Sequence, residues 1–163
     1  MSRKKKQSIL EIPLSDVEII CNDFTVFCEY LVDHKVKISK NTGHIGKKDC
    51  FELNKLLYRK EEYDKATRFQ ERYPIIHYFY YIALKYRILE LNISKNGFIY
   101  GRNYDLYQNA PALERYTLFL VNFFFDIKYM EGYHFAPFHI NPFLEWVDEE
   151  KPEEGKVYQV PYN

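Results

Sequence analysis

Lysine side chains are the most plainly clustered binding groups of this 163-residue chain. One cluster surrounds a predicted turn and the start of a predicted helix, and another forms a basic arm at positions 3–6. Free backbone amides at a helix N-terminus attract phosphate, and neighbouring lysines add salt-sensitive affinity that does not depend on base sequence. The pattern therefore predicts contact with a nucleic-acid backbone through Lys4, Lys5, Lys6, Lys37, Lys40, Lys47 and Lys48.

Cysteine and histidine supply two conceivable nucleophile–base pairs, Cys28 with His34 and Cys50 with His44. Both cysteines fall on predicted buried helix faces, where a thiol stays protonated and inert. Cys21 and Cys28 share one helix face but lie about 10 Å apart along its axis, which is too far for a disulfide. We therefore expect three buried, reduced thiols and no cysteine-based catalysis.

Two other segments suggest ligand chemistry without completing a motif. His134 and His139 are five residues apart in a proline-containing stretch, so they share no helix face and a metal would need ligands from elsewhere. The stretch from Gly43 to Lys48 is similar to a phosphate-binding loop, but it lacks the glycine spacing and the Ser or Thr after lysine. The sequence predicts no metal site, no cofactor and no enzyme activity.

The composition is neutral as a whole and rich in aromatic residues, with 23 basic and 23 acidic side chains and 18% Phe, Trp and Tyr. The charges segregate: residues 1–60 have a net charge of +4, residues 61–163 of −4, and residues 145–154 alone of −5. A chain this apolar is not intrinsically disordered, yet it lacks the run of about 18 apolar residues typical of a transmembrane helix. With no signal-peptide pattern, we expect a cytoplasmic protein of one domain without membrane contact.

Apolar periodicity and turn residues predict the elements that position these groups. Apolar residues recur at helical spacing from Val17 to Leu31, after a cap at Ser15 or Asp16. Pro74 suits the first turn of another helix, and the turn at 94–97 predicts a β-hairpin. The expected order is a helix of about 18 residues, a strand at 36–39, a helix at 47–59, a loop or helical extension at 60–73, a helix from Pro74, a hairpin at 88–100, an irregular segment at 101–109 and a helix at 111–129.

This order is that of a winged helix-turn-helix domain with an appended helix, in which the turn at 94–97 is the wing. We therefore expect a mostly helical α+β domain at residues 15–130, after a basic arm at residues 1–14. Residues 131–163 are predicted to form an extended tail that is first rich in proline and aromatic residues and then acidic.

The stretch from Val36 to Asp49, VKISKNTGHIGKKD, resembles the winged-helix-like N-terminal region of a family of bacterial plasmid- and mobile-element-associated proteins. In that family a short strand and a glycine turn precede a helix that begins with a Lys-Lys-Asp type of sequence. Residues 76–91 resemble the helix and strand that follow in that family. The resemblance as a whole spans residues 15–130. It implies a winged-helix fold and carries over no functional residue.

The third expected helix argues against sequence-specific reading of DNA. Residues 73–87 contain no Asn, Gln or Ser and have cations only in the last turn, whereas base edges are read chiefly by Arg, Lys, Asn and Gln. The 14 residues at 60–73 also exceed the turn of about 3–4 residues that joins the two helices of a helix-turn-helix.

Excess apolar surface instead favours a protein-facing function. The third and fourth expected helices are apolar on more than one side, so either the tail or a second chain must cover them. We predict a non-catalytic interaction module that forms a homodimer or joins a larger assembly; the alternative is a winged-helix protein that contacts the phosphate backbone of DNA or RNA. The predicted partner interface consists of Tyr78, Tyr80, Tyr81, Phe123 and Phe125.

Overall fold

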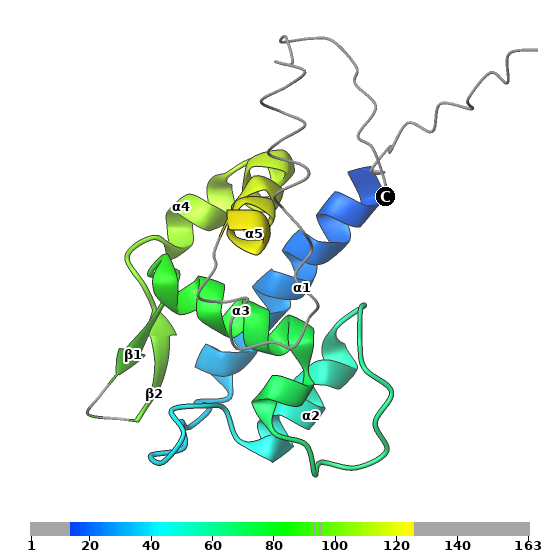
Figure 1. The fold of residues 1–163 in the computed structure, drawn as a ribbon. Helices are drawn as coiled ribbons and strands as arrows, with labels where there is room; N and C mark the ends of the chain where they lie inside the picture. The colour runs from blue at the N-terminus through cyan, green and yellow to red at the C-terminus, as the bar shows by residue number, and fades with distance from the viewer. Residues whose placement is uncertain (1–13, 93, 95, 126–163) are drawn as a thin grey trace, which may run out of the picture. The chain divides into compact units, whose positions relative to one another are not determined.

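A computed structural model describes residues 14–92, 94 and 96–125, which form the expected mostly helical α+β fold. Residues Pro13–Phe119 make one compact unit, and Leu120–Phe125 continue the last helix into a second. Leu14, the last residue of the predicted basic arm, begins α1, while residues 1–13 and the tail at 131–163 lie outside the described residues. The elements are α1 (Leu14–Asp33), α2 (Lys47–Leu56), the 3-10 helix η1 (Gln70–Arg72), α3 (Pro74–Lys85), β1 (Leu89–Asn92), β2 (Gly97–Tyr100), α4 (Tyr104–Asn109) and α5 (Ala112–Phe125) (Figure 1).

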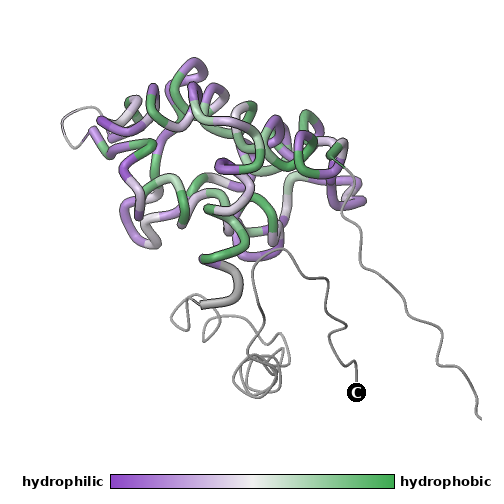
Figure 2. The backbone as a smooth tube through the Cα atoms, turned by 90° about the horizontal axis from the view of Figure 1, so that it is seen from above, coloured by the Kyte–Doolittle hydropathy of each residue, from purple (hydrophilic) through white to green (hydrophobic). Residues whose placement is uncertain are grey.

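Helix α1 has the apolar stripe that its sequence predicts. Of the stripe predicted at helical spacing, Val17, Phe24, Phe27 and Leu31 are buried, together with Cys21 and Cys28, and Ile20 is half-buried. Hydrophobic and hydrophilic residues also alternate along the other helices, as the green and purple stretches of the backbone tube show (Figure 2). A stripe of this period faces one side of a helix, so it brings the whole length of α1 against the other elements.

Phe24 lies at the centre of the aromatic core. Its ring centroid is 5.1 Å from that of Phe79 in α3, 5.0 Å from that of Tyr107 in α4 and 5.2 Å from that of Phe119 in α5. All three pairs are edge-on, a geometry that contributes about 0.5–1.5 kcal/mol for each pair beyond the burial of its surface. These four rings therefore pack α3, α4 and α5 on α1.

Two residues after the end of α1 and of α3 the chain adopts the left-handed conformation, at Lys35 (φ 51°) and Arg87 (φ 51°). In each case the next amide bonds back five residues, from Val36 to Leu31 and from Ile88 to Ala83. This is the Schellman arrangement, in which an apolar residue just after the helix packs against its last turn. Val36 and Ile88 are both buried, so the two helix ends fix where the following segments begin.

The predicted hairpin is confirmed. Strands β1 and β2 pair antiparallel with Leu89 opposite Tyr100 and Asn92 opposite Gly97, and Asn96 in the turn has φ 50°. The predicted strand at 36–39 is wrong: only an isolated bridge joins Ile38 to Ile45. The chain turns back at once after Ser39, where the Gly43 amide donates to the Ser39 carbonyl, so no longer ladder can form.

Two further boundaries differ from the predicted ones. Helix α2 ends at Leu56 rather than at position 59, because the buried Asp23 carboxylate accepts the Tyr58 and Arg59 amides (2.8 and 3.2 Å) and draws the chain off the helix axis. Helix α4 occupies part of the segment 101–109 that was expected to be irregular. Tyr107 is the one buried side chain of this six-residue helix, so its sequence has no repeated apolar spacing that would predict a helix.

Candidate nucleic-acid interface

Residues 35–48, which we call the lysine segment, contain five lysines and no Asp or Glu. Its backbone is tied to the core at several points. Val36 and Ile45 are buried, and the Ile45 amide donates to Oε1 of the buried Gln70 (2.8 Å). Ile38 and Asn96 are joined by two reciprocal bonds, from the Ile38 amide to the Asn96 carbonyl (3.4 Å) and from Asn96 Nδ2 to the Ile38 carbonyl (3.0 Å). The segment is thus held as a fixed support for its lysines.

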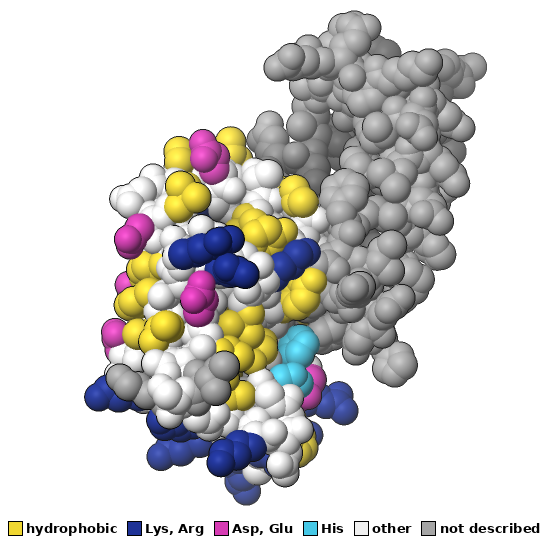
Figure 3. Space-filling view, turned by 90° about the vertical axis from the view of Figure 1, so that its left-hand side faces the viewer, with side chains coloured by type: hydrophobic (Ala, Val, Ile, Leu, Met, Phe, Trp, Pro, Cys, Tyr) yellow, Lys and Arg dark blue, Asp and Glu magenta, His cyan; other side chains and the backbone are white. Residues whose placement is uncertain are grey.

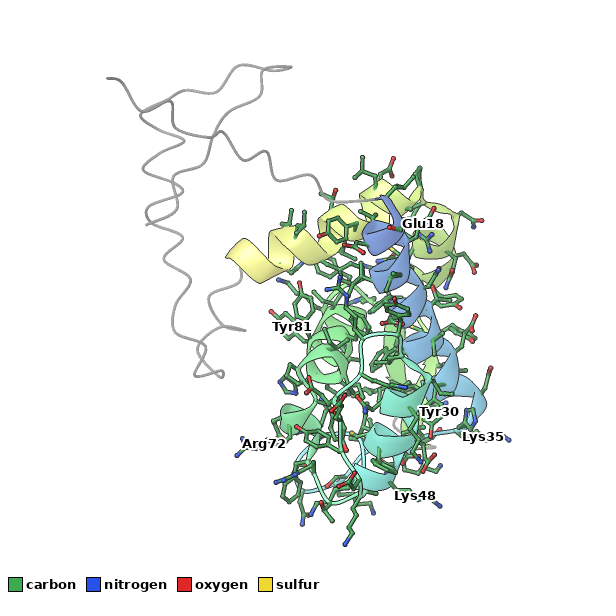
Figure 4. All side chains as sticks on the ribbon, turned by 90° about the vertical axis from the view of Figure 1, so that its right-hand side faces the viewer. Glu18, Tyr30, Lys35, Lys48, Arg72 and Tyr81 are labelled. Carbon is green, nitrogen blue, oxygen red and sulfur yellow. The ribbon has the colours of Figure 1, made fainter. Side chains whose placement is uncertain are left out.

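The lysine side chains of this segment are exposed. Lys37 and Lys40 flank the Ile38 bridge, and Lys47 and Lys48 begin α2, with Lys47 Nζ 3.8 Å from the centroid of the Phe69 ring. Lys and Arg side chains gather at the lower end of the molecule in Figure 3, and Lys35 and Lys48 point outward from that end in Figure 4. The structure therefore brings together four of the seven predicted phosphate contacts; Lys4, Lys5 and Lys6 lie outside the described residues.

Three of these four lysines are not paired with a carboxylate in the described residues. Within the described part of the chain, no ion pair joins Lys40, Lys47 or Lys48 to an acidic side chain. The nearest ion pair of the segment is that of His44, whose Nδ1 is 2.9 Å from Glu71 Oε1. Lysines that are not paired with a carboxylate can contact the phosphates of a nucleic acid and displace the counterions bound there.

A hollow of about 380 Å³ adjoins the lysine segment. His44 forms one wall, and the outer face of α3 forms the other. The His44 ring centroid is 5.5 Å from that of His77 and 6.1 Å from that of Tyr80. The residues that line the hollow are His44, His77, Tyr80, Tyr81, Leu84 and Lys85. The four-residue spacing of His77, Tyr81 and Lys85 places these three on one face of α3. No local sequence signal predicts that His44 lies beside that face.

Gln70 fixes the protonation state of His77. Its Oε1 accepts the Ile45 amide, so its Nε2 must donate to Nδ1 of His77 (3.1 Å), which can accept only when the ring is neutral. Burial lowers the pKa of His77 below its ordinary value and the nearby His44 lowers it further, whereas Glu71 raises it. The neutral form is therefore the one that the fold stabilises.

Acidification is expected to destabilise the fold through His77. The unfolded chain binds a proton at the ordinary pKa of about 6.5 and the folded chain only at a lower one, so the stability is full above this pH and declines as the pH falls below it. Urea unfolding at several values between pH 7.5 and 5 measures the loss. His77→Gln, whose amide oxygen can accept the same bond without titrating, should lose less stability; equal losses would contradict this role of His77.

The three tyrosines of the predicted partner interface do not form one exposed face, which corrects that expectation. Tyr78 is buried, and its hydroxyl donates to the Phe119 carbonyl. Tyr80 is half-buried and donates to the Gly43 carbonyl, while Tyr81 lines the hollow and projects from α3 in Figure 4. Neighbouring positions on a helix point in different directions, so a run of tyrosines divides between core and surface. The side chains of Phe123 and Phe125 lie outside the described residues.

The three cysteines are buried and unpaired in disulfides, as the sequence predicts. Cys50 Sγ donates to the Ile45 carbonyl (3.7 Å), and burial raises its pKa to about 12. Burial also raises the pKa of Cys28 well above its ordinary value, and Nδ1 of His34 bonds to the Tyr30 carbonyl rather than to a thiol. Neither conceivable nucleophile–base pair is assembled.

The described residues contain neither a metal-binding group nor a membrane-spanning helix. No three His, Cys, Asp or Glu side chains in this part of the chain are grouped so that they could hold a metal ion, and His134 and His139 lie outside it. None of its helices combines the length and the apolar character that crossing a membrane demands. In comparisons with known proteins, no family model, no curated protein and no solved structure matches the chain.

Proposed function

We propose that this chain is a non-catalytic module of winged-helix type that contacts the phosphate backbone of nucleic acid through Lys37, Lys40, Lys47 and Lys48. The observation that carries the proposal is the exposure of these four cations on a segment that has no acidic residue and whose backbone is tied to the core. A backbone that is already ordered loses little conformational entropy on binding, so less of the binding free energy is spent on ordering it. The affinity then comes from counterion release and does not depend on base sequence.

The winged-helix assignment is supported by the order α1, α2, α3, β1, β2 and by the bonds between Ile38 and Asn96. Those bonds join the short extended stretch after α1 to the residue that precedes β2, as expected if this stretch is the edge of the wing sheet. Asn96 donates its side-chain amide to the Ile38 carbonyl, where a regular strand ladder would use a backbone amide. In this arrangement the lysine segment and the hairpin turn share one end of the domain.

Fluorescence anisotropy with a labelled oligonucleotide of arbitrary sequence tests the proposal. At about 50 mM salt we expect a dissociation constant in the micromolar range, typical of backbone contact alone, and little dependence on sequence. An absence of binding at this salt concentration would end the proposal.

A protein-facing function is the second candidate, favoured by exposed leucines. Leu106 of α4 is 73% exposed and Leu113 of α5 is 65% exposed. A homodimer or a larger assembly would bury side chains of this kind. Sedimentation at micromolar concentration should then give twice the 19.8 kDa mass of the monomer. A monomer that becomes no larger with concentration would exclude the homodimer.

A further inference from the structure

The outer face of α3 differs chemically from a helix that reads duplex DNA. Its outward positions are His77, Tyr81, Leu84 and Lys85, which lie on one side of the helix and line the hollow. The whole helix contains no Asn, Gln or Arg. Base edges in the major groove are recognised chiefly by those side chains and by lysine, so this face offers little for reading paired bases.

The same face is suited to flat, unpaired rings. Tyr80 and Tyr81 supply aromatic surfaces, and Lys85 Nζ lies 5.4 Å from the centroid of the Tyr81 ring. His77 of this face meets His44 of the lysine segment edge to face, with an interplanar angle of 86°. Proteins that bind single strands combine such aromatic surfaces, on which bases stack, with a cationic track for the phosphates.

The hollow and the cationic track are parts of one continuous surface. His44 belongs to the lysine segment, and the Tyr80 hydroxyl donates to the carbonyl of the adjacent Gly43, so this part of the segment is bonded to α3. Lys47 follows His44 by three residues, which limits the distance between their Cα atoms to about 11 Å. A strand whose bases enter the hollow therefore has its phosphates near Lys47 and its neighbours.

We propose that the hollow between His44 and α3 takes the unpaired bases of single-stranded nucleic acid, while the lysine segment holds the adjoining phosphates. This inference rests on the proposed function and narrows its ligand from nucleic acid in general to single strands. Stacking requires only the face of a base, so the binding tolerates any sequence.

Anisotropy titrations of the full chain with three labelled probes of equal length test the inference. The probes are an oligothymidine of about 20 nucleotides, a duplex and an abasic strand that has the phosphates without bases. We expect the oligothymidine to bind most tightly and the other two more weakly. Tyr81→Ala should weaken oligothymidine binding by about 5- to 100-fold and duplex binding by less than about twofold, because only the former loses stacking. Tyr81→Phe, which keeps the ring, should bind like the original chain.

The outcomes separate the two proposals. Equal affinity for all three probes, with no effect of Tyr81→Ala, would overturn the role of the hollow and leave phosphate contact standing. The abasic probe gives this answer on the unaltered chain, so it does not depend on how well the variant folds. If no probe binds at low salt, the proposed function itself fails and the protein-facing candidate takes its place.

Discussion

Replacement of Lys37, Lys40, Lys47 and Lys48 by glutamate is expected to weaken binding to a single strand about 50-fold or more at about 50 mM salt. Four phosphate contacts on a single strand make the affinity fall about 50-fold when salt rises from about 50 to 200 mM, because each contact releases counterions. Reversing the four charges removes that contribution and adds repulsion. All four side chains are exposed, so the fold should remain, as circular dichroism and urea unfolding would check.

A second quadruple variant makes this loss specific to the lysine segment. Four other exposed cations outside the segment and outside the hollow can be reversed in the same way: Arg59, Lys60, Lys65 and Arg102. The two variants have the same net charge, so a general electrostatic effect would weaken both equally. We expect the second variant to keep most of its affinity when both are titrated by anisotropy, and an equal loss in the two would contradict the assignment of the site.

Substitution of Gly101 by alanine is expected to cost about 3 kcal/mol of folding free energy. A Cβ atom at this position would lie 2.2 Å from the Arg87 carbonyl oxygen and 2.8 Å from its carbon. Neither backbone can move away easily, because the Gly101 amide donates to the Ile88 carbonyl (2.9 Å) and the Asn103 amide donates to that same Arg87 carbonyl (3.1 Å). The clash would separate the end of α3 from the end of the hairpin.

Gly46→Ala is the matched control for this substitution. Gly46 has φ −65°, which any residue adopts, and an added Cβ would meet only Asp49 Oδ2 at an ordinary 3.5 Å. We expect its free energy of unfolding to stay within about 0.5 kcal/mol of the original in urea titrations. Similar values for the two alanine variants would show that the close approach at Gly101 is not required.

Helix α1, helix α3 and the hairpin were predictable because their signals are local. The stripe from Val17 to Leu31 needs only its own periodicity, and Pro74 marks the first residue of α3. The turn residues at 94–97 mark the hairpin, although only Asn96 of the Asn-Gly pair has a positive φ and Gly97 begins β2. These elements form from information within about 20 residues, so reading them requires no knowledge of tertiary contacts.

The end of α2 and the walls of the hollow could not be predicted, because distant residues decide them. Asp23 ends α2 through amides 35 and 36 residues further along the chain. His44 meets His77 across a bend that Gln70 helps to hold through its bonds to Ile45 and His77, 25 and 7 residues away. Which tyrosine of α3 is buried depends on where Phe119 of α5 packs, since Tyr78 bonds to the Phe119 carbonyl. A helix with apolar residues on all sides does not show in its sequence which side faces the core.

The dependence of affinity on salt tests the central claim most directly. If Lys37, Lys40, Lys47 and Lys48 contact the phosphates of a single strand, a plot of log K against log salt concentration should be linear with a slope of about −3. Each single replacement of one of these lysines by glutamine should reduce that slope by about 0.7, since one counterion-releasing contact is lost. A slope near zero, or one that the four replacements leave unchanged, would contradict phosphate binding by the lysine segment.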